Sequence, residues 1–207
     1  MPKVKVPRKS TAIDMTAMCD VAFLLLTFFI LTATARQPEP LPVDIPSSVV
    51  QIKVPDTDIA TLTVGDGKVF FGVAGPEVRK NMLERVAKQY NIQFTEEEKY
   101  RFSLVESFGV PIGSLKQLLA MDGSKRNEPG VQPGIPADSV GNRASELTDW
   151  IYAARYATKE LNNKDLRFSI KGDSQEEYPS VKKVMDILQR QNVNKFSLIT
   201  SLEGSEQ

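Results

Sequence analysis

The chain contains no histidine and only one cysteine among its 207 residues. Without histidine, Ser-His-Asp and Cys-His catalytic groups and histidine-ligated metal sites are excluded. Cys19 alone cannot form an intramolecular disulfide, and we interpret it as a small packing residue. The sequence also shows no nucleophile–base pair, phosphate loop or metal-ligand cluster, so we expect neither enzyme activity nor a cofactor or metal.

The chain has no net charge either, because 26 basic residues balance 26 acidic ones. Nothing in this balance indicates nucleic acid as a partner. The charges are unevenly placed, however: the first nine residues hold four basic residues and no acid, namely Lys3, Lys5, Arg8 and Lys9. A basic tail of this kind is typical of the cytoplasmic flank of a membrane helix.

Apolar residues are concentrated in Ala12 to Ala35, where only Thr27 interrupts the run from Val21 to Leu31. Helical residues rise about 1.5 Å each, so a stretch of this length can cross the roughly 30 Å of a bilayer core. We therefore predict a cytoplasmic tail at residues 1–11 and a transmembrane helix at residues 12–35 that contacts membrane lipid. The remaining chain would lie on the far side of the membrane.

A cleaved signal peptide is the alternative interpretation of the same segment. It would have the basic tail, the apolar core and an A-x-A cleavage site at Ala33 to Ala35. The mature protein would then be a secreted binding module. Asp14 and Asp20 argue against this alternative, because they lie between the tail and the apolar core, where a signal peptide has no use for carboxylates.

Asp20 lies on a stripe of residues along the predicted helix. At about 100° per residue, the members of this stripe fall within roughly 40° of Thr16 on the helical wheel. Their spacing is 4, 3, 4, 3, 4, which is the periodicity of the seam between two packed helices. We call them the seam residues: Thr16, Asp20, Phe23, Thr27, Ile30 and Thr34. This pattern predicts a dimer with Phe23 and Ile30 in the packing.

A carboxylate within the bilayer costs about 2.5–3.5 kcal/mol on insertion scales, so Asp20 should face protein or water. Apolar surroundings disfavour its charged form, which makes it a candidate proton carrier. The hydroxyls of Thr16, Thr27 and Thr34 could donate to it or hold waters along a proton path. The alternative is that Asp20 only caps the helix in the headgroup zone. For Asp14, about 160° from Thr16, we expect a role at the cytoplasmic boundary.

The region after the helix has the pattern of a linker and a small domain. Residues 36–57 contain prolines and predict an extended linker. Strands are expected at 58–64 and 68–72 around a Gly65-Asp66-Gly67 turn, then a helix from Pro76. A strand at 166–171, a helix from Pro179 and a strand at 195–201 close the domain (residues 58–201). Residues 202–207 form a tail, and for Asp173 we expect a turn or capping role.

The motif Ile13-Asp14-Met15-Thr16, with Met18, Asp20, Leu25-Leu26 and Phe28-Phe29 after it, resembles that of the ExbD/TolR family. Ala17 departs from the family pattern, which usually has proline there. The resemblance implies a single N-terminal transmembrane helix plus a small α+β periplasmic domain of order β-β-α, insertion, β-α-β. It also maps the proton-carrying aspartate of the family onto Asp20.

The resemblance further implies an inner-membrane motor driven by protons. Two copies of the helix would stand in an ExbB-like multi-span ring and drive a TonB-like energy transducer, with the domain in the periplasm. A TolR-like subunit and a MotB-like stator remain alternatives, although the MotB class needs a longer peptidoglycan-binding domain. Which transducer is driven stays open.

The segment at about residues 92–163 is extra relative to the family pattern. We expect in it a helix at Gly113–Met121, a disordered loop at Asp122–Asn142 and a helix at about Ala144–Leu161. Its aromatic residues Trp150, Tyr152 and Tyr156 are interpreted as packing and not as binding residues. The segment could cover the domain or contact a partner.

Overall fold

The computed structural model describes residues 15–32, 39–45, 47–48, 57–139, 144–174, 176–199 and 201–202. The chain divides into two compact units, residues 1–37 and 38–207. In the first unit the structure describes one helix, α1 (Met15–Thr32). The basic tail, Asp14 and Thr34 lie outside the described residues.

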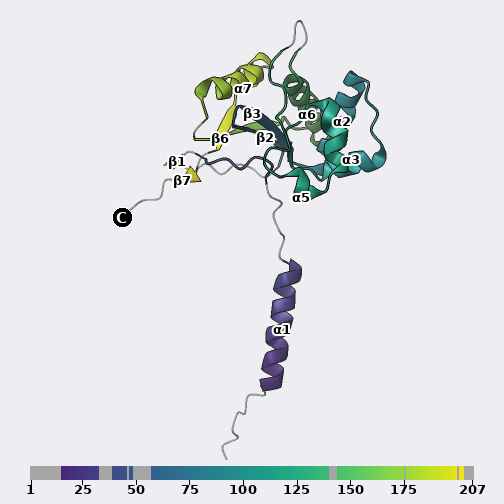
Figure 1. Ribbon diagram of the computed structural model, residues 1–207, viewed down its shortest axis with the longest axis vertical. Coiled ribbons are helices and arrows are strands. Elements are labelled where there is room, and N and C mark those ends of the chain that lie inside the picture. The colour runs from purple at the N-terminus through teal and green to yellow at the C-terminus, as the bar shows by residue number, and fades with distance from the viewer. Residues whose placement is uncertain are drawn as a thin grey trace, which may run out of the picture. The chain divides into compact units, whose positions relative to one another are not determined.

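The second unit is an α/β domain with a mixed five-stranded sheet (Figure 1). The strand order is β4-β3-β2-β5-β6, with β3 antiparallel to both β2 and β4, and β5 parallel to both β2 and β6. These strands are β2 (Ile59–Gly65), β3 (Lys68–Val73), β4 (Ser107–Phe108), β5 (Arg167–Gly172) and β6 (Phe196–Ile199). A separate parallel pair joins β1 (Ser47–Ser48) to β7 (Ser201–Leu202). The predicted order of strands and helices is confirmed.

The hairpin between β2 and β3 follows from its turn residues. Gly65 pairs with Lys68, so that only Asp66 and Gly67 form the loop. Their φ angles are 52° and 67°, both in the left-handed region that a type I′ turn requires. Glycine reaches this region without strain and aspartate tolerates it better than most residues, which explains why this dipeptide sets the register of the hairpin.

The helices begin and end at recognisable capping residues. Pro76 opens α2, and Asn91 ends it in the left-handed conformation. Thr95 and Glu98 form a reciprocal capping box at the start of the next helix, α3. The bounds in the domain are α2 (Pro76–Tyr90), α3 (Glu96–Ser103), the 3-10 turn η1 (Ile112–Ser114), α4 (Leu115–Ala120), α5 (Gly123–Arg126), α6 (Glu146–Asn162) and α7 (Tyr178–Arg190).

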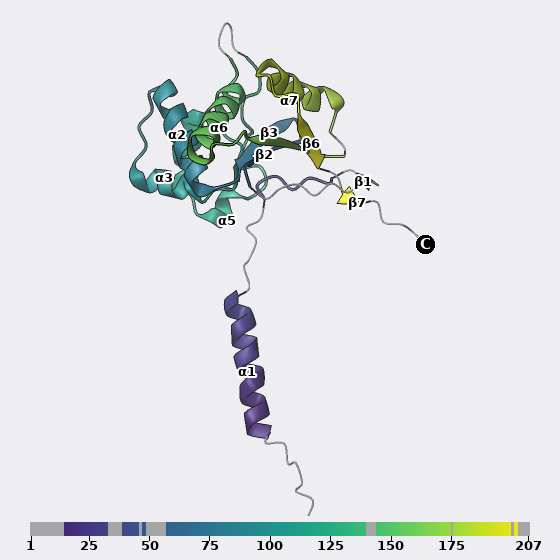
Figure 2. The same ribbon diagram turned by 180° about the vertical axis from the view of Figure 1, so that it is seen from behind.

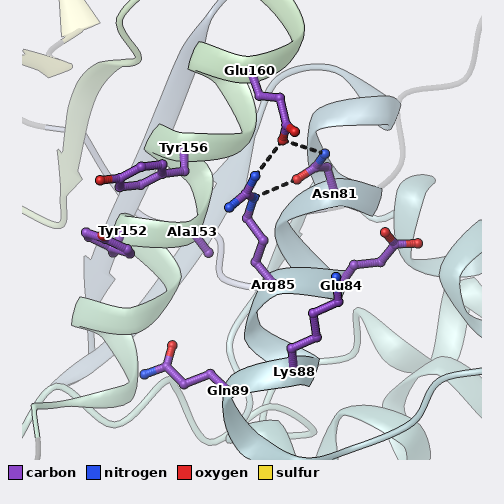
Figure 3. A pocket seen from close by; sticks show the side chains of 9 residues that line it. All are labelled: Asn81, Glu84, Arg85, Lys88, Gln89, Tyr152, Ala153, Tyr156 and Glu160. Carbon is purple, nitrogen blue, oxygen red and sulfur yellow. Dashed lines mark hydrogen bonds and ion pairs between the residues drawn. The ribbon is translucent and has the colours of Figure 1, made fainter.

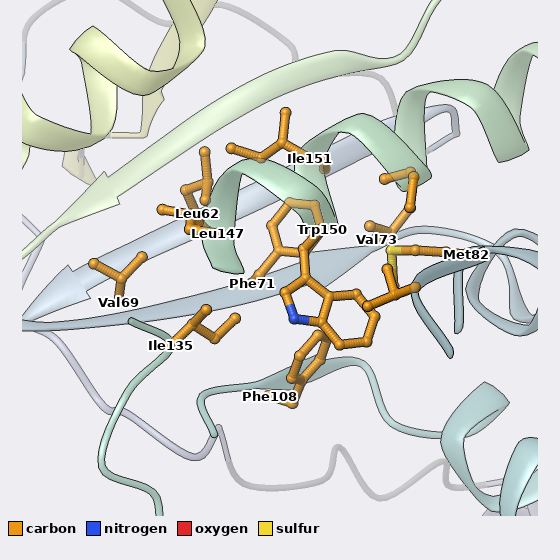
Figure 4. Packing of buried hydrophobic residues seen from close by; sticks show 14 of the residues in the cluster. Leu62, Val69, Phe71, Val73, Met82, Phe108, Ile135, Leu147, Trp150 and Ile151 are labelled. Atoms are coloured by element: carbon orange, nitrogen blue, oxygen red, sulfur yellow. The ribbon is translucent and has the colours of Figure 1, made fainter. Parts of the chain in front are cut away.

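An aromatic cluster lies at the centre of the domain core (Figure 4). Trp150 of α6 is fully buried, and its ring lies 4.8 Å from that of Phe108 and 6.0 Å from that of Phe102. Phe71 of β3 meets Phe108 edge to face at 6.4 Å. Three of these four rings belong to the segment 92–163. The segment is therefore part of the core and not only a cover over it.

The prediction of a disordered loop at Asp122–Asn142 was wrong for residues 122–139, which the structure describes. This stretch contains α5 and three buried side chains, those of Arg126, Gln132 and Ile135. The Gln132 side chain accepts a 2.7 Å hydrogen bond from the backbone of Gly109, and the Ile135 backbone donates to Val69 at 2.8 Å. These long-range bonds hold a glycine- and proline-rich sequence in place, whereas its local composition indicated no fixed structure.

The described linker residues 39–45 lie against the domain (Figure 2). The backbone amide of Ser174 donates to the carbonyl of Asp44 at 2.8 Å, and Glu39 forms an ion pair with Lys171. A methyl group added at Gly65 would lie only 2.8 Å from the Val43 side chain, which shows how closely the two segments approach. This part of the linker packs along the end of β2 and β5.

Candidate functional site

Helix α1 is the helix in the described part of the chain that is long and apolar enough to cross a membrane. It has 18 residues and a mean hydropathy of 2.0. At about 1.5 Å per residue its length is roughly 27 Å, close to the thickness of a hydrocarbon core. Asp20 is the single charged residue within it.

Four of the seam residues other than Asp20 lie on the described helix: Thr16, Phe23, Thr27 and Ile30. The continuous helix keeps their 3.6-residue periodicity, so they share one face with Asp20. Phe23 and Ile30 are about two-thirds exposed, and α1 has no buried residue. Thr34 and Asp14 lie outside the described residues, so their predicted roles remain predictions.

Thr27 makes a specific contact within α1. Its hydroxyl donates to the backbone carbonyl of Leu24 at 2.9 Å, as the Thr32 hydroxyl does to Phe28 at 2.7 Å. Bonds of this type satisfy threonine hydroxyls in membrane helices. Because the Thr27 proton is used in this way, the oxygen of Thr27 can only accept further hydrogen bonds. Toward a water it would act as an acceptor, not as a donor.

A second candidate region lies between α2 and α6 in the domain (Figure 3). Arg85 donates to Glu160 at 2.5 Å and to Asn81 at 2.9 Å, and Asn81 donates to Glu160 at 3.2 Å. The hydrogen bond from Arg85, followed by that from Asn81, lowers the pKa of the Glu160 carboxyl. The triad links two helices, and its charges neutralise each other.

The three aromatic residues of α6 differ in environment. Trp150 is buried, which confirms its packing role, but Tyr152 and Tyr156 are 52% and 50% exposed. Their rings lie 4.5 Å apart, and both line pockets on the surface. The packing interpretation therefore does not hold for the two tyrosines. A helical wheel could have separated them, because they are four residues apart and lie off the face that carries Trp150 and Ala154.

Asp173 lies in a turn between β5 and α7, in agreement with prediction. Its backbone amide donates to Val64 at 3.0 Å and its carbonyl accepts from Glu176 at 3.1 Å. The residue at the N-terminal cap of α7 is Glu177. Within the residues that the structure describes, no group of three or more His, Cys, Asp or Glu side chains is placed to hold a metal ion.

Comparison with known proteins identifies a family. The family model described as Biopolymer transport protein ExbD/TolR matches residues 7–203, nearly the whole chain. No curated protein and no solved structure gave a match. The matched region includes α1 with Asp20 as well as the complete five-stranded sheet. With its single candidate membrane helix and its α/β domain, the chain belongs to the ExbD/TolR family of biopolymer transport proteins.

Proposed function

We propose that this chain is an ExbD-like subunit of a proton-driven inner-membrane motor, and that Asp20 carries the proton. The observation that supports this most directly is the position of Asp20, the single charged residue of α1, on a face formed with Thr16, Phe23, Thr27 and Ile30. A carboxylate in an apolar membrane helix is costly, so such a residue usually faces protein or water and marks a functional site. Family membership supplies the context of energy-coupled transport.

The proposed assembly has two copies of this chain. Their α1 helices pack through the seam residues inside an ExbB-like multi-span ring. The N-terminus is cytoplasmic and the domain periplasmic, where it acts on a TonB-like energy transducer. The basic tail supports this orientation through the positive-inside rule.

The energetic cycle rests on one titrating group. Protonation neutralises Asp20 and removes its need for a polar partner, whereas deprotonation restores that need. Each charge that crosses the membrane contributes about 2.3 kcal/mol per 100 mV. Alternation between the two forms would favour different rotational positions of α1 within the ring.

The test is Asp20→Asn, which keeps the size and polarity of the side chain but removes the titrating proton. The variant is expressed in a strain that lacks the gene for this protein. We expect this strain to take up no outer-membrane cargo, while the variant still co-purifies with the ring protein. Leu24→Val, on another face of α1, is the control and should keep uptake. Normal cargo uptake with Asp20→Asn would show that Asp20 does not carry the proton. Failure of the variant to co-purify with the ring protein would show that Asp20 has a structural role.

A TolR-like role in envelope maintenance is the second candidate, because the matching family model joins ExbD and TolR. The two roles can be distinguished in the strain that lacks this protein, by measuring both detergent resistance and cargo uptake. If the chain restores resistance to detergent but not cargo uptake, the TolR-like role is correct. The opposite result supports the ExbD-like one.

A further inference from the structure

A groove of about 970 Å³ lies on the outer side of α6, where α6 meets the end of α7 and the start of β6. It is lined from α6 by Tyr152, Arg155, Tyr156 and Lys159, by Arg190 at the end of α7, and by Lys195 just before β6. Its size equals the upper end of small-ligand pockets, about 300–1,000 Å³, so a single small ion would not fill it.

The charge of this groove is strongly unbalanced. Arg155, Lys159, Arg190 and Lys195 line it, with Asp165 as the one carboxylate. Asp165 pairs with Lys159 at 3.0 Å. Among the described residues, neither Arg190 nor Lys195 has a carboxylate within ion-pair distance. Two exposed cations thus remain available to an acidic ligand.

The tyrosine pair gives the groove an aromatic wall. Tyr152 and Tyr156 lie one turn apart on α6, with rings 4.5 Å from each other and a tilt of 44°. An exposed helix face normally carries charged side chains, and half-exposed paired tyrosines offer flat apolar area together with hydroxyl groups. Tyrosine and arginine are also the residues that dominate the energetics of protein interfaces. The wall therefore suits a polypeptide side chain better than a bare anion.

Hydrogen bonds hold the floor of the groove in place. Arg155 donates to the backbone carbonyl of Gln191 at 2.8 Å, and the Gln191 side chain donates to the carbonyl of Thr148 at 2.8 Å. These bonds tie α6 to the end of α7. A groove whose walls are already fixed loses little conformational entropy when a ligand binds.

The pocket between α2 and α6 offers a direct contrast. It shares Tyr152 and Tyr156, but its charged lining is two acids and two bases, Glu84, Arg85, Lys88 and Glu160. Arg85 pairs with Glu160, and Glu84 pairs with Lys99. Lys88 has no ion pair among the described residues, but the acids and bases of this lining balance in number. An excess of positive charge is thus found only on the other side of the tyrosine pair.

We propose that the groove beside α6 docks an acidic, extended segment of a protein partner. Carboxylates of the segment would pair with Arg190 and Lys195, and an apolar side chain would lie on Tyr152 and Tyr156. Such a surface gives charge selectivity and a fast encounter. This inference concerns the α/β domain and does not depend on the role of Asp20.

The probe for the test is a short peptide of glutamate and serine with a central tryptophan, labelled with an uncharged fluorophore. Its binding to the full chain in neutral detergent is followed by fluorescence anisotropy at low salt. We expect saturable binding that weakens about five- to tenfold in Arg190→Gln/Lys195→Gln and also weakens in Tyr152→Ala. A peptide with glutamine in place of glutamate should bind at least about tenfold more weakly.

The matched control is Lys125→Gln/Lys182→Gln, which removes the same charge from exposed positions outside the groove. It should bind the peptide like the unchanged chain. An equal loss in the control would mean diffuse attraction to positive charge, and unchanged binding in Arg190→Gln/Lys195→Gln would place the peptide elsewhere. Either result overturns the proposal, as does equal affinity for the glutamine peptide. None of these readouts requires a membrane gradient, so they are separate from the test of Asp20.

Discussion

The hydroxyl of Tyr90, the last residue of α2, donates a 2.7 Å hydrogen bond to the carboxylate of Asp149 in α6. Asp149 is only 9% exposed and precedes Trp150 at the centre of the core. The bond joins two helices that belong to different parts of the chain, and it satisfies a carboxylate that water can scarcely reach.

Removal of this hydrogen bond should destabilise the domain. Tyr90→Phe leaves the Asp149 carboxylate without its partner, and we expect a loss of about 1–3 kcal/mol in the free energy of unfolding. Urea denaturation of the full chain in detergent can be followed by the fluorescence of Trp150, the only tryptophan. The same change at an exposed position, Tyr178→Phe, should have almost no effect. Equal midpoints for the two variants would contradict the prediction.

A methyl group should not be tolerated at Gly72 in β3. A Cβ there would lie 2.5 Å from the backbone carbonyl oxygen of Glu106, so the β3–β4 contact would have to shift. Overpacking of this kind costs about 1–3 kcal/mol. Gly113→Ala is the matched control, because a Cβ at Gly113 meets nothing within 4 Å. Thermal unfolding monitored by circular dichroism should show a lower midpoint for Gly72→Ala alone.

Acid should remove part of the stability that the Arg85–Glu160 pair supplies. The pKa of Glu160 is lowered in the folded chain, chiefly by its hydrogen bond to Arg85. Its contribution is therefore complete above the unfolded pKa, which is about 4.3, and is lost as the pH falls through the folded pKa. The difference in urea midpoint between the unchanged chain and Glu160→Gln should shrink between about pH 5 and pH 3. A constant difference over this range would refute the coupling.

Two copies of α1 should cross-link best through the seam residues. In a Cys19→Ser background, single cysteines at positions 23, 27 and 30 should form disulfides in native membranes more readily than cysteines at Leu24, Leu25 or Phe28. The reason is their common face on α1. The yield is read from non-reducing gels. A yield that does not vary around the helix would argue against a defined dimer seam.

Local chemistry made much of the fold predictable. Three features act within a few residues of the chain: the Asp66-Gly67 turn, the prolines that open α2 and α7, and the alternation of β2. Their effect on the fold can therefore be predicted from the sequence. The chain between residues 122 and 139 was mispredicted for the opposite reason. Its structure depends on bonds from Gln132 and Ile135 to residues far away in sequence.

The candidate sites divide in the same way. The face of α1 that carries Asp20 follows from helical periodicity alone, so the sequence was sufficient to define it. That two copies pack along this face stays a prediction. The groove beside α6 required the fold, because Arg190 and Lys195 reach Tyr152 and Tyr156 only after α7 packs in place. No spacing rule connects residues that meet across two elements.

The parallel pairing of β2 with β5 has a consequence for biosynthesis. Ile59 pairs with Arg167, so roughly one hundred residues separate the two central strands of the sheet. At about 5–20 residues per second, the ribosome needs about 5–20 s to make this interval. The β2–β3 hairpin can close within microseconds, yet β2 keeps an unpaired edge until β5 has been made. Nascent chains thus carry an exposed strand that other chains could pair with, and a chaperone that shields residues 59–65 would protect them during this delay.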